Sequence, residues 1–305
     1  MNEIQNKMSS NLVSHETTTT MEDRNKIYDF DPDQNFDNLK TSCLEALKNS
    51  DDKSQDQMLF KDDKFPPIAM SLNNTKQETD FGFQNITWKR ASELVHDPKF
   101  IVDGATRFDI NQGELGNCWV LASIASLTMK KKLFTKVVPN DQSFGEEDYA
   151  GIFHFRFWQA DRWVDVVIDD YLPTLNGNLI FITSKAQNEF WPALLEKAYA
   201  KLNGSYQAID GGWPSRSLTD LTGGISEDYI LAERNPDDIF KIMMKAQKKS
   251  ALMTCCTAVD PDVKENETPE GLITGKDNHH VTLNWICVFF DRVTYVILRT
   301  CIHYH

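Results

Sequence analysis

The residues best suited to chemistry lie between positions 112 and 119, directly before a mostly apolar run that ends at Leu127. Asn117 is a good candidate for a helix N-cap, and a helix that is apolar on nearly every side is usually buried. We therefore predict a buried helix that begins at Cys118. Because the N-terminal end of a helix favours an anion, the Cys118 thiol is placed where it ionises more readily to the nucleophilic thiolate.

Gln112 lies six residues before this cysteine, and Gly113 and Gly116 let the intervening chain bend and approach another part of the structure closely. Such a bend would bring the Gln112 amide back toward the sulfur. Together with the backbone N–H of Cys118, it would supply two donors to the oxyanion that forms when a thiolate attacks a carbonyl group. A lone cysteine on an apolar helix is more often an inert core residue, and the spacing from Gln112 is what favours a nucleophile here.

The Gln-x5-Cys-Trp pattern at a helix start is typical of papain-like cysteine proteases, and this stretch resembles the protease core of calpains. The resemblance extends to segments on the N-terminal side of the cysteine, namely Phe65-Pro66-Pro67, Trp88-Lys89-Arg90, Glu93-Leu94 and residues 101–107. It implies an α+β fold, a papain-like core in which a mainly helical cysteine subdomain faces a β-rich second subdomain. We expect the second subdomain to be incomplete in this chain.

The composition is that of a folded protein. The chain has 305 residues, 41% of them hydrophobic and 11% aromatic, enough for one large or two modest domains. Its net charge of −13 argues against a nucleic-acid partner, which would need a basic surface. The six cysteines show no paired spacing except Cys255-Cys256, and neither a signal peptide at the N-terminus nor a membrane span is expected. A cytoplasmic location is the natural expectation.

Four segments are expected along the chain. Residues 1–57 are polar and should form a flexible tail with one short helix near 39–47. Residues 58–213 should form the cysteine-bearing subdomain, and residues 214–275 the start of the second subdomain. Residues 276–305 diverge from the calpain pattern, which suggests a truncated or alternatively read C-terminus.

Hydrophobic periodicity predicts the remaining elements of the core: a short strand or bend followed by a short helix at 86–94, a hairpin of strands at 151–158 and 163–170, helices at 189–202 and 238–249, and a strand at 253–259. The helix at 189–202 is expected to be amphipathic and to stop at Gly204. His154 falls in the first hairpin strand and is predicted to be an ordinary strand residue.

The resemblance also implies a calcium site. Calpain cores hold a calcium ion in the cysteine-bearing half through two backbone carbonyls, which correspond to Val102 and Gly104, and through carboxylates, which correspond to Asp109 and Glu189. These types suit calcium, which takes about six to eight oxygen ligands. Because Asp109 lies three residues before Gln112, calcium would order the turn that carries the oxyanion donor and so gate activity. Without the resemblance, both carboxylates would be interpreted as solvated surface charges.

The base that a thiol protease needs is missing from its expected place. A histidine takes the thiol proton, and an Asn or Asp orients the histidine. In calpains the histidine follows a Gly-Leu-x-x-Gly segment, which is present here as residues 271–275, but the next residue is Lys276. The Asn-Pro-Trp setting of the orienting residue is also missing. His279 and His280 are the nearest substitutes, whereas a protonated lysine donates but does not accept a proton.

The resemblance therefore implies a calcium-dependent cysteine endopeptidase of the calpain type, with Cys118 as the nucleophile and Gln112 as the oxyanion donor. It would carry out limited proteolysis, and this chain is expected to be impaired or inactive without a matching His and Asn. The competing interpretation is a non-catalytic calpain-like regulatory protein that binds calcium or peptides. The implied partners are protein substrates and a regulatory subunit or an inhibitor protein.

Overall fold

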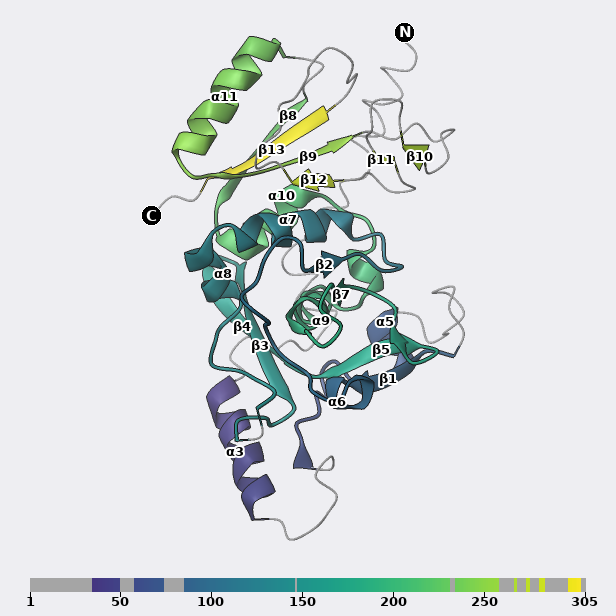
Figure 1. The fold of residues 1–305 in the computed structure, drawn as a ribbon. Helices are drawn as coiled ribbons and strands as arrows, with labels where there is room; N and C mark the ends of the chain where they lie inside the picture. The colour runs from purple at the N-terminus through teal and green to yellow at the C-terminus, as the bar shows by residue number, and fades with distance from the viewer. Residues whose placement is uncertain are drawn as a thin grey trace. The chain divides into compact units, whose positions relative to one another are not determined.

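The structure is a computed structural model, and it describes residues 35–49, 58–73, 85–145, 147–230 and 234–257, together with four short strand segments further along the chain. Helices and small antiparallel sheets alternate along these residues (Figure 1). This arrangement confirms the α+β fold that the sequence predicts. The expected segment boundaries after residues 57, 213 and 275 stay predictions.

Helices and strands are interleaved along the described residues. In chain order, the helices are α3 (Phe36–Lys48), α5 (Ala69–Leu72), α6 (Ala91–Leu94), α7 (Cys118–Thr128), α8 (Lys131–Val137), α9 (Trp191–Asn203), the 3₁₀ turn η2 (Gln207–Ile209), α10 (Pro214–Thr222) and α11 (Pro236–Lys248). The strands are β1 (Thr87–Arg90), β2 (Ile110–Asn111), β3 (Ile152–Gln159), β4 (Arg162–Asp169), β5 (Tyr171–Leu175), β6 (Asn178–Leu179), β7 (Thr183–Ser184), β8 (Ile225–Ile230), β9 (Leu252–Thr257), β10 (Asn266–Glu267), β11 (Ile273–Thr274), β12 (His280–Thr282) and β13 (Val296–Ile302).

Most of the predicted elements are found. The strand β1 leads into α6, and β3 pairs with β4 along its whole length as the predicted hairpin. The helices near 39–47, at 189–202 and at 238–249 are α3, α9 and α11, and the strand at 253–259 is β9, with residues 258 and 259 outside the described part. Helix α10 was not predicted, although Pro214 at its start and Gly223 with φ of 68° at its end are both recognisable helix boundary signals.

Helix α9 lies at the centre of the cysteine-bearing part and contacts β3, β4, β5 and β7 (Figure 1). It ends at Gly204, whose φ of 102° gives the expected left-handed stop. The prediction that this helix is amphipathic was wrong about its polar side. Glu196, Lys197 and Lys201 are buried as fully as the apolar residues around them.

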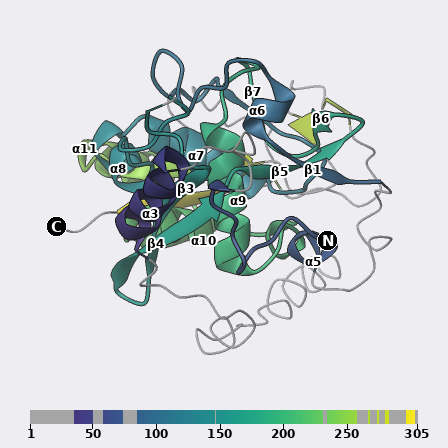
Figure 2. The same ribbon diagram turned by 90° about the horizontal axis from the view of Figure 1, so that it is seen from below.

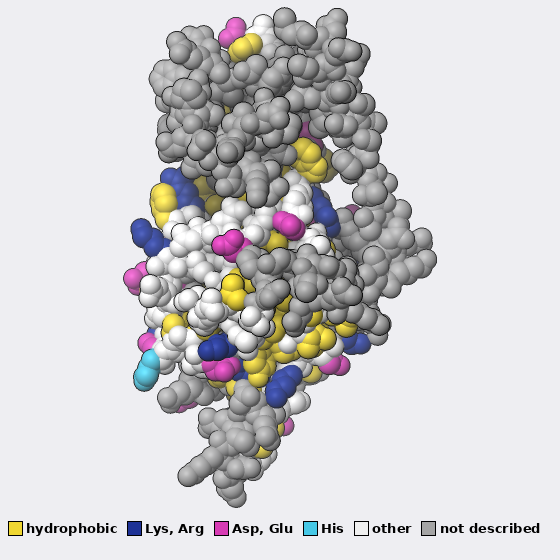
Figure 3. Space-filling model, turned by 90° about the vertical axis from the view of Figure 1, so that its right-hand side faces the viewer, with side chains coloured by type: hydrophobic (Ala, Val, Ile, Leu, Met, Phe, Trp, Pro, Cys, Tyr) yellow, Lys and Arg dark blue, Asp and Glu magenta, His cyan; other side chains and the backbone are white. Residues whose placement is uncertain are grey.

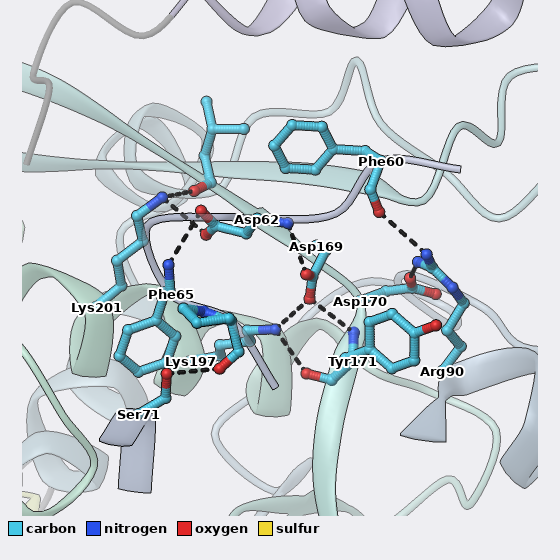
Figure 4. A network of polar contacts seen from close by, with 12 residues as sticks. Phe60, Asp62, Phe65, Ser71, Arg90, Asp169, Asp170, Tyr171, Lys197 and Lys201 are labelled. Atoms are coloured by element: carbon cyan, nitrogen blue, oxygen red, sulfur yellow. Dashed lines mark hydrogen bonds and ion pairs between the residues drawn. The ribbon is translucent and has the colours of Figure 1, made fainter. Parts of the chain in front are cut away.

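Buried ion pairs explain how a central helix can carry two lysines. Lys197 donates to Asp169, and Lys201 donates to Asp62 at 2.8 Å (Figure 4). The Asp62 backbone N–H in turn donates to the second oxygen of Asp169, also at 2.8 Å. Because a buried charge is tolerated when it is paired and hydrogen-bonded, these contacts fix the rotation of α9 about its axis.

Helix α3 packs against β3, as Figure 2 also shows. The Phe36 ring stacks on His154 with 3.8 Å between ring centroids, and Lys40 forms an ion pair with Asp148 at 2.6 Å. His154 is buried between Asp165, 2.7 Å from its Nδ1 atom, and Asp141, 2.9 Å from Nε2. These contacts support the prediction that His154 is structural.

The four-stranded sheet has the strand order β12-β9-β13-β8, and it forms the second sheet-containing part of the described chain. Helix α11 lies next to β9. Ile239 of α11 is buried against Met253 of β9, which joins the helix to the sheet. Leu252, the neighbouring residue of β9, is buried with Leu218 of α10. Strand β9 is therefore packed on both faces, toward α11 and toward the cysteine-bearing part.

The surface of the described residues is mixed in charge. On the face drawn in Figure 3, Lys and Arg side chains are scattered among Asp and Glu side chains. None of the helices in the described part of the chain has the length and apolar character that crossing a membrane requires.

Candidate active site

Cys118 is the first residue of α7, as predicted, and its side chain is buried, with 7% of the residue exposed. Asn117 occupies the N-cap position, but its side chain makes no capping hydrogen bond to the first turn. Its Nδ2 atom instead donates to Glu196 of α9 at 2.6 Å. The first turn of the helix, to which Cys118 belongs, therefore has no N-cap side chain competing for the positive end of the helix dipole.

The turn before α7 is pinned to neighbouring backbone. A Cβ atom on Gly113 would lie 2.2 Å from the Phe181 carbonyl oxygen, so only glycine fits there. The next residue, Glu114, donates its N–H to the Ile180 carbonyl at 2.9 Å. The Gly116 N–H donates to the Asp210 carboxylate at 2.8 Å. The predicted close approach of the backbone at this turn is confirmed.

Gln112 is exposed, and its Nε2 atom donates to the Leu115 carbonyl at 2.9 Å. This bond folds the amide back over the same turn that leads to Cys118. A primary amide has two N–H groups, so one such bond is compatible with a second one to an oxyanion. The role of Gln112 as an oxyanion donor stays a prediction.

Trp119 anchors the start of α7 in the core. The indole is fully buried, and its Nε1–H donates to the Ile209 carbonyl at 3.1 Å. A Cβ atom on Gly212 would come within 2.4 Å of the ring, so the indole lies directly against this glycine. Further along the helix, the Ser123 and Ser217 hydroxyls are 2.6 Å apart and join α7 to α10.

The residues predicted to bind calcium lie in adjoining segments. The Val102 N–H donates to the Glu189 carboxylate at 2.6 Å, and the Lys185 N–H donates to the Asp109 carbonyl at 3.1 Å. Burial raises the pKa of Glu189, hydrogen bonds from Ser184 and Val102 oppose this, and the Asp109 charge raises the pKa further. The fold therefore brings Asp109 and Glu189 close enough for their charges to interact.

The side chains of this neighbourhood could bind a hard cation only if backbone carbonyl oxygens also served as ligands. In the part of the chain that the structure describes, no three His, Cys, Asp or Glu side chains gather in a way that could hold a metal ion. The predicted set contains two carboxylates, so carbonyl oxygens and water would have to complete it. Gly104, which supplies one of the predicted carbonyls, has φ of 88° and follows Asp103 with φ of 53°, so the loop turns sharply here.

The region of the missing base is described only in part. Lys276 and His279 lie outside the described residues, whereas the backbone of His280 begins β12. His280 pairs with Cys256 of β9, and both strands lie beside α7. Of the two predicted substitutes, His280 is thus placed on an element next to the cysteine helix.

Comparison with known proteins decides the family. The family described as calpain family cysteine protease matches residues 60–283. The chain belongs to the calpain family. The matched range continues past Gly275 and includes His279 and His280.

Individual calpains are similar over most of this chain. It is 46% identical to Calpain-A of Drosophila melanogaster over 261 residues, 47% identical to the Calpain-1 catalytic subunit of Rattus norvegicus over 248, and 49% identical to Calpain-8 of Mus musculus over 248. These matches cover 86%, 79% and 79% of the chain but 29%, 32% and 33% of the relatives. The chain therefore spans about a third of the length of the curated relatives that it matches.

Glu196 is the residue at this site that sequence reasoning missed. Its Oε1 atom accepts the Asn117 bond, and its Oε2 atom accepts the Ile182 N–H at 2.9 Å. A charged residue within an amphipathic helix is ordinarily expected to face solvent. Lys197 and Lys201 are four residues apart and share one face of the helix, whereas Glu196 lies about 100° around the helix from Lys197. Polar residues on two sides of the same helix are the signal that could have found it.

Proposed function

We propose that this chain is a calpain-type cysteine endopeptidase core in which Cys118 attacks peptide carbonyl groups. The observation that carries the proposal is the position of Cys118 at the start of the buried helix α7, directly after a turn clamped by Gly113 and Asp210. Family membership supports it, because the matched family is one of cysteine proteases. Protein substrates and limited proteolysis are part of this proposal.

In the proposed reaction the Cys118 thiolate forms a bond to the carbonyl carbon, and the carbonyl π electrons move to oxygen. The Gln112 amide and the Cys118 N–H would stabilise this oxyanion. The tetrahedral intermediate then collapses, which breaks the C–N bond. The base, now protonated, gives its proton to the leaving amine. Water then hydrolyses the thioester and regenerates the thiol.

Proton transfer is the step in which we propose that this chain is impaired. Lys276 stands where the family has its histidine, and a lysine at its ordinary pKa is protonated and accepts no proton. His280 is the candidate substitute, since its backbone lies on β12 beside α7. We therefore expect the formation of a covalent adduct at Cys118 to survive better than repeated turnover.

We further propose that calcium binds to the Asp109 and Glu189 carboxylates and to the Val102 and Gly104 carbonyls. Two nearby carboxylates repel each other when both are ionised, and a divalent cation between them would relieve that repulsion. Strand β2 follows Asp109 directly and leads to Gln112. A bound cation that orders this segment would therefore also order Gln112, the proposed oxyanion donor.

The direct test is labelling by a thiol-directed peptidyl epoxide at neutral pH, with and without calcium, followed by mass spectrometry of the modified cysteine. We expect rapid, calcium-stimulated labelling of Cys118 that the Cys118→Ser variant abolishes. The matched control is Cys43→Ser, because burial raises the pKa of the Cys43 thiol. Labelling of Cys118 no faster than that of a simple thiol would support the non-catalytic, peptide- or calcium-binding alternative instead.

Calcium binding is tested separately by titration calorimetry on Asp109→Asn and Glu189→Gln. Each variant should weaken binding because it removes one charged oxygen ligand. Asp103→Asn is the matched control, since it removes a charge from the same loop at an exposed residue outside the proposed ligand set. Equal affinity in all four proteins would reject this site.

A further inference from the structure

Glu196 is a buried carboxyl group to which the proposed chemistry gives no role. It lies on the central helix α9 with 1% of the residue exposed. Both of its oxygens accept hydrogen bonds, one from the Asn117 side chain at 2.6 Å and one from the Ile182 backbone at 2.9 Å. Neither partner carries a charge, so this is not a buried ion pair like those of Lys197 and Lys201.

The two partners of Glu196 lie on the two sides of the nucleophile turn. Asn117 directly precedes Cys118 and is itself fully buried. Ile182 follows the backbone of residues 180 and 181, against which Gly113 is packed and to which Glu114 donates. A single side chain on a rigid helix therefore fixes both the residue before the sulfur and the strip of backbone that supports the turn.

We infer that Glu196 is a positioning residue for Cys118, acting through Asn117 and Ile182 to set the start of helix α7 and the shape of the turn from Gln112. This inference rests on the proposed role of Cys118 as a nucleophile. Glu196 contacts neither the sulfur nor a substrate in this arrangement. Its effect would be on how readily the thiol ionises and reacts.

The Asn117–Glu196 contact can be made in two ways. In the structure Nδ2 of Asn117 donates, and among the described residues its buried Oδ1 atom has no hydrogen-bond partner. If Glu196 is protonated, its O–H can donate to that Oδ1 atom once the amide is turned over, since the two amide orientations have the same shape. Burial raises the pKa of Glu196 to about 8, against the opposing effect of the bonds from Ile182 and Asn117. Both the protonated and the ionised form of Glu196 are therefore populated near neutral pH.

The charges near Glu196 are few. Tyr206, which follows α9, is fully buried, and its pKa is raised by burial and then by the charges of Glu196 and Asp169. On α9 itself, Lys197 is directed to Asp169 and not to Glu196. In the described region, therefore, the titration of Glu196 is governed by its burial and its two neutral donors.

The experiment is alkylation of the full chain by iodoacetamide across about pH 6 to 9, a range that spans thiol ionisation, with the rate at Cys118 read by mass spectrometry. Glu196→Ala leaves the Ile182 and Asn117 donors without an acceptor. We expect it to shift the midpoint of the Cys118 profile upward by about one pH unit, a tenfold loss of thiolate at a given pH. Cys43 in the same molecule is the internal reference, and its profile should not move.

Glu196→Gln is the conservative variant that separates positioning from folding. Its Oε1 atom can accept the Ile182 N–H while Nε2 donates to Asn117 Oδ1, so both contacts are kept. We expect it to react at Cys118 within about threefold of the wild type and to lose any change in rate that accompanies ionisation of the Glu196 carboxyl. The matched control is Asp220→Asn, because Asp220 is a buried carboxylate that accepts from Tyr199 and Gln159, both at 2.8 Å, away from the turn.

The outcomes are distinct. An unchanged Cys118 profile in folded Glu196→Ala, or an equal shift in Asp220→Asn, would overturn the inference. If Glu196→Ala does not fold, Glu196→Asp takes its place, because its carboxylate is one methylene shorter and cannot keep both contacts; an unchanged Cys118 profile in folded Glu196→Asp would overturn the inference too. If wild-type Cys118 reacts no faster than Cys43, the proposed function fails, and the ratio of variant to wild-type rates still tests the positioning role.

Discussion

Cys118 and the carboxyl group that binds the residue before it favour different charge states. The N-terminal dipole of α7 favours a thiolate at Cys118, whereas burial favours the neutral form of Glu196. Burial raises the pKa of Glu196 to about 8, so the carboxyl is mostly neutral at neutral pH and Glu196→Ala removes little charge there. The loss of its two hydrogen bonds is therefore what should change the reactivity of Cys118 in that variant.

The pH dependence of stability should reveal this carboxyl. Its pKa is 4.5 in the unfolded chain and about 8 in the folded one, so between these values the folded protein keeps a proton that the unfolded chain has lost. The stabilising contribution of this proton is complete below the unfolded pKa and is lost as the pH rises through the folded value. We expect Glu196→Gln to gain stability over the wild type by roughly 1.4 kcal/mol per pH unit within that window.

Urea unfolding of both proteins at several pH values from about 5 to 9 measures this difference. Asp220→Asn serves as the reference for removal of another buried carboxylate. Stability curves of wild type and Glu196→Gln that run parallel across the range would show that Glu196 is already ionised near pH 5 in the folded protein.

At the scale of elements, the turn between β2 and α7 is held by contact with the backbone of residues 180–182. Gly113 sits so close to this backbone that its Cβ would be 2.2 Å from one carbonyl oxygen and 2.4 Å from another. Because both obstacles are backbone atoms, they cannot move aside as a side chain can. If Gly113 is replaced by a larger residue, the turn must move away from the backbone of residues 180–182.

Gly113→Ala should therefore cost about 1–3 kcal/mol or more of unfolding free energy, in the range of overpacked cores. It should also slow alkylation of Cys118, because the bond from Glu114 to Ile180 would be lost with the contact. Gly145→Ala is the control, since its added Cβ would meet only the Ser143 hydroxyl at 3.3 Å. A Gly113→Ala protein with wild-type stability and a wild-type Cys118 rate would mean that this contact does not constrain the turn.

The sequence was sufficient for the periodic elements and insufficient for the polar contacts between them. Helix α7 and the β3–β4 hairpin follow from hydrophobic patterns, whereas Gly113 indicated a close approach without indicating that the obstacle is the backbone of residues 180 and 181. The partner of Asn117 could not be foreseen, because Glu196 is 79 residues away and only the packing of α9 brings it there. Lys197 and Lys201 were hidden for the same reason, since their acceptors, Asp169 and Asp62, lie on other elements.

At the scale of the whole molecule, the described chain joins an N-terminal helix, a cysteine-bearing part and the strands of a second sheet. A 13-residue helix such as α3 is marginal in water by itself, so it depends on packing against β3. Phe36 supplies that packing through its stacked contact with the buried His154. The cytoplasmic location and the regulatory or inhibitory partners expected from the sequence stay predictions.

Removal of this contact should release α3 from the rest of the protein. Phe36→Ala leaves a cavity next to His154, and because α3 can open separately from the rest of the protein, global stability should fall by less than the about 3–5 kcal/mol of a fully coupled core Phe→Ala change. Hydrogen exchange of the amides in residues 36–48 should then be much faster than in the wild type, while exchange in α9 changes less. Glu45→Ala, at an exposed position of the same helix, is the control, and equal exchange of α3 in both variants would contradict this role of Phe36.

The most direct measurement of the central claim is single-turnover acylation by a peptide p-nitrophenyl ester. Its leaving group needs no proton, so attack by Cys118 is observed even if the base is impaired. We expect a burst of about one equivalent of nitrophenolate per chain, then slow turnover, with the burst lost in Cys118→Ser and kept in Cys43→Ser. A burst that survives Cys118→Ser, or no burst in the wild type, would contradict the assignment of Cys118 as an activated nucleophile.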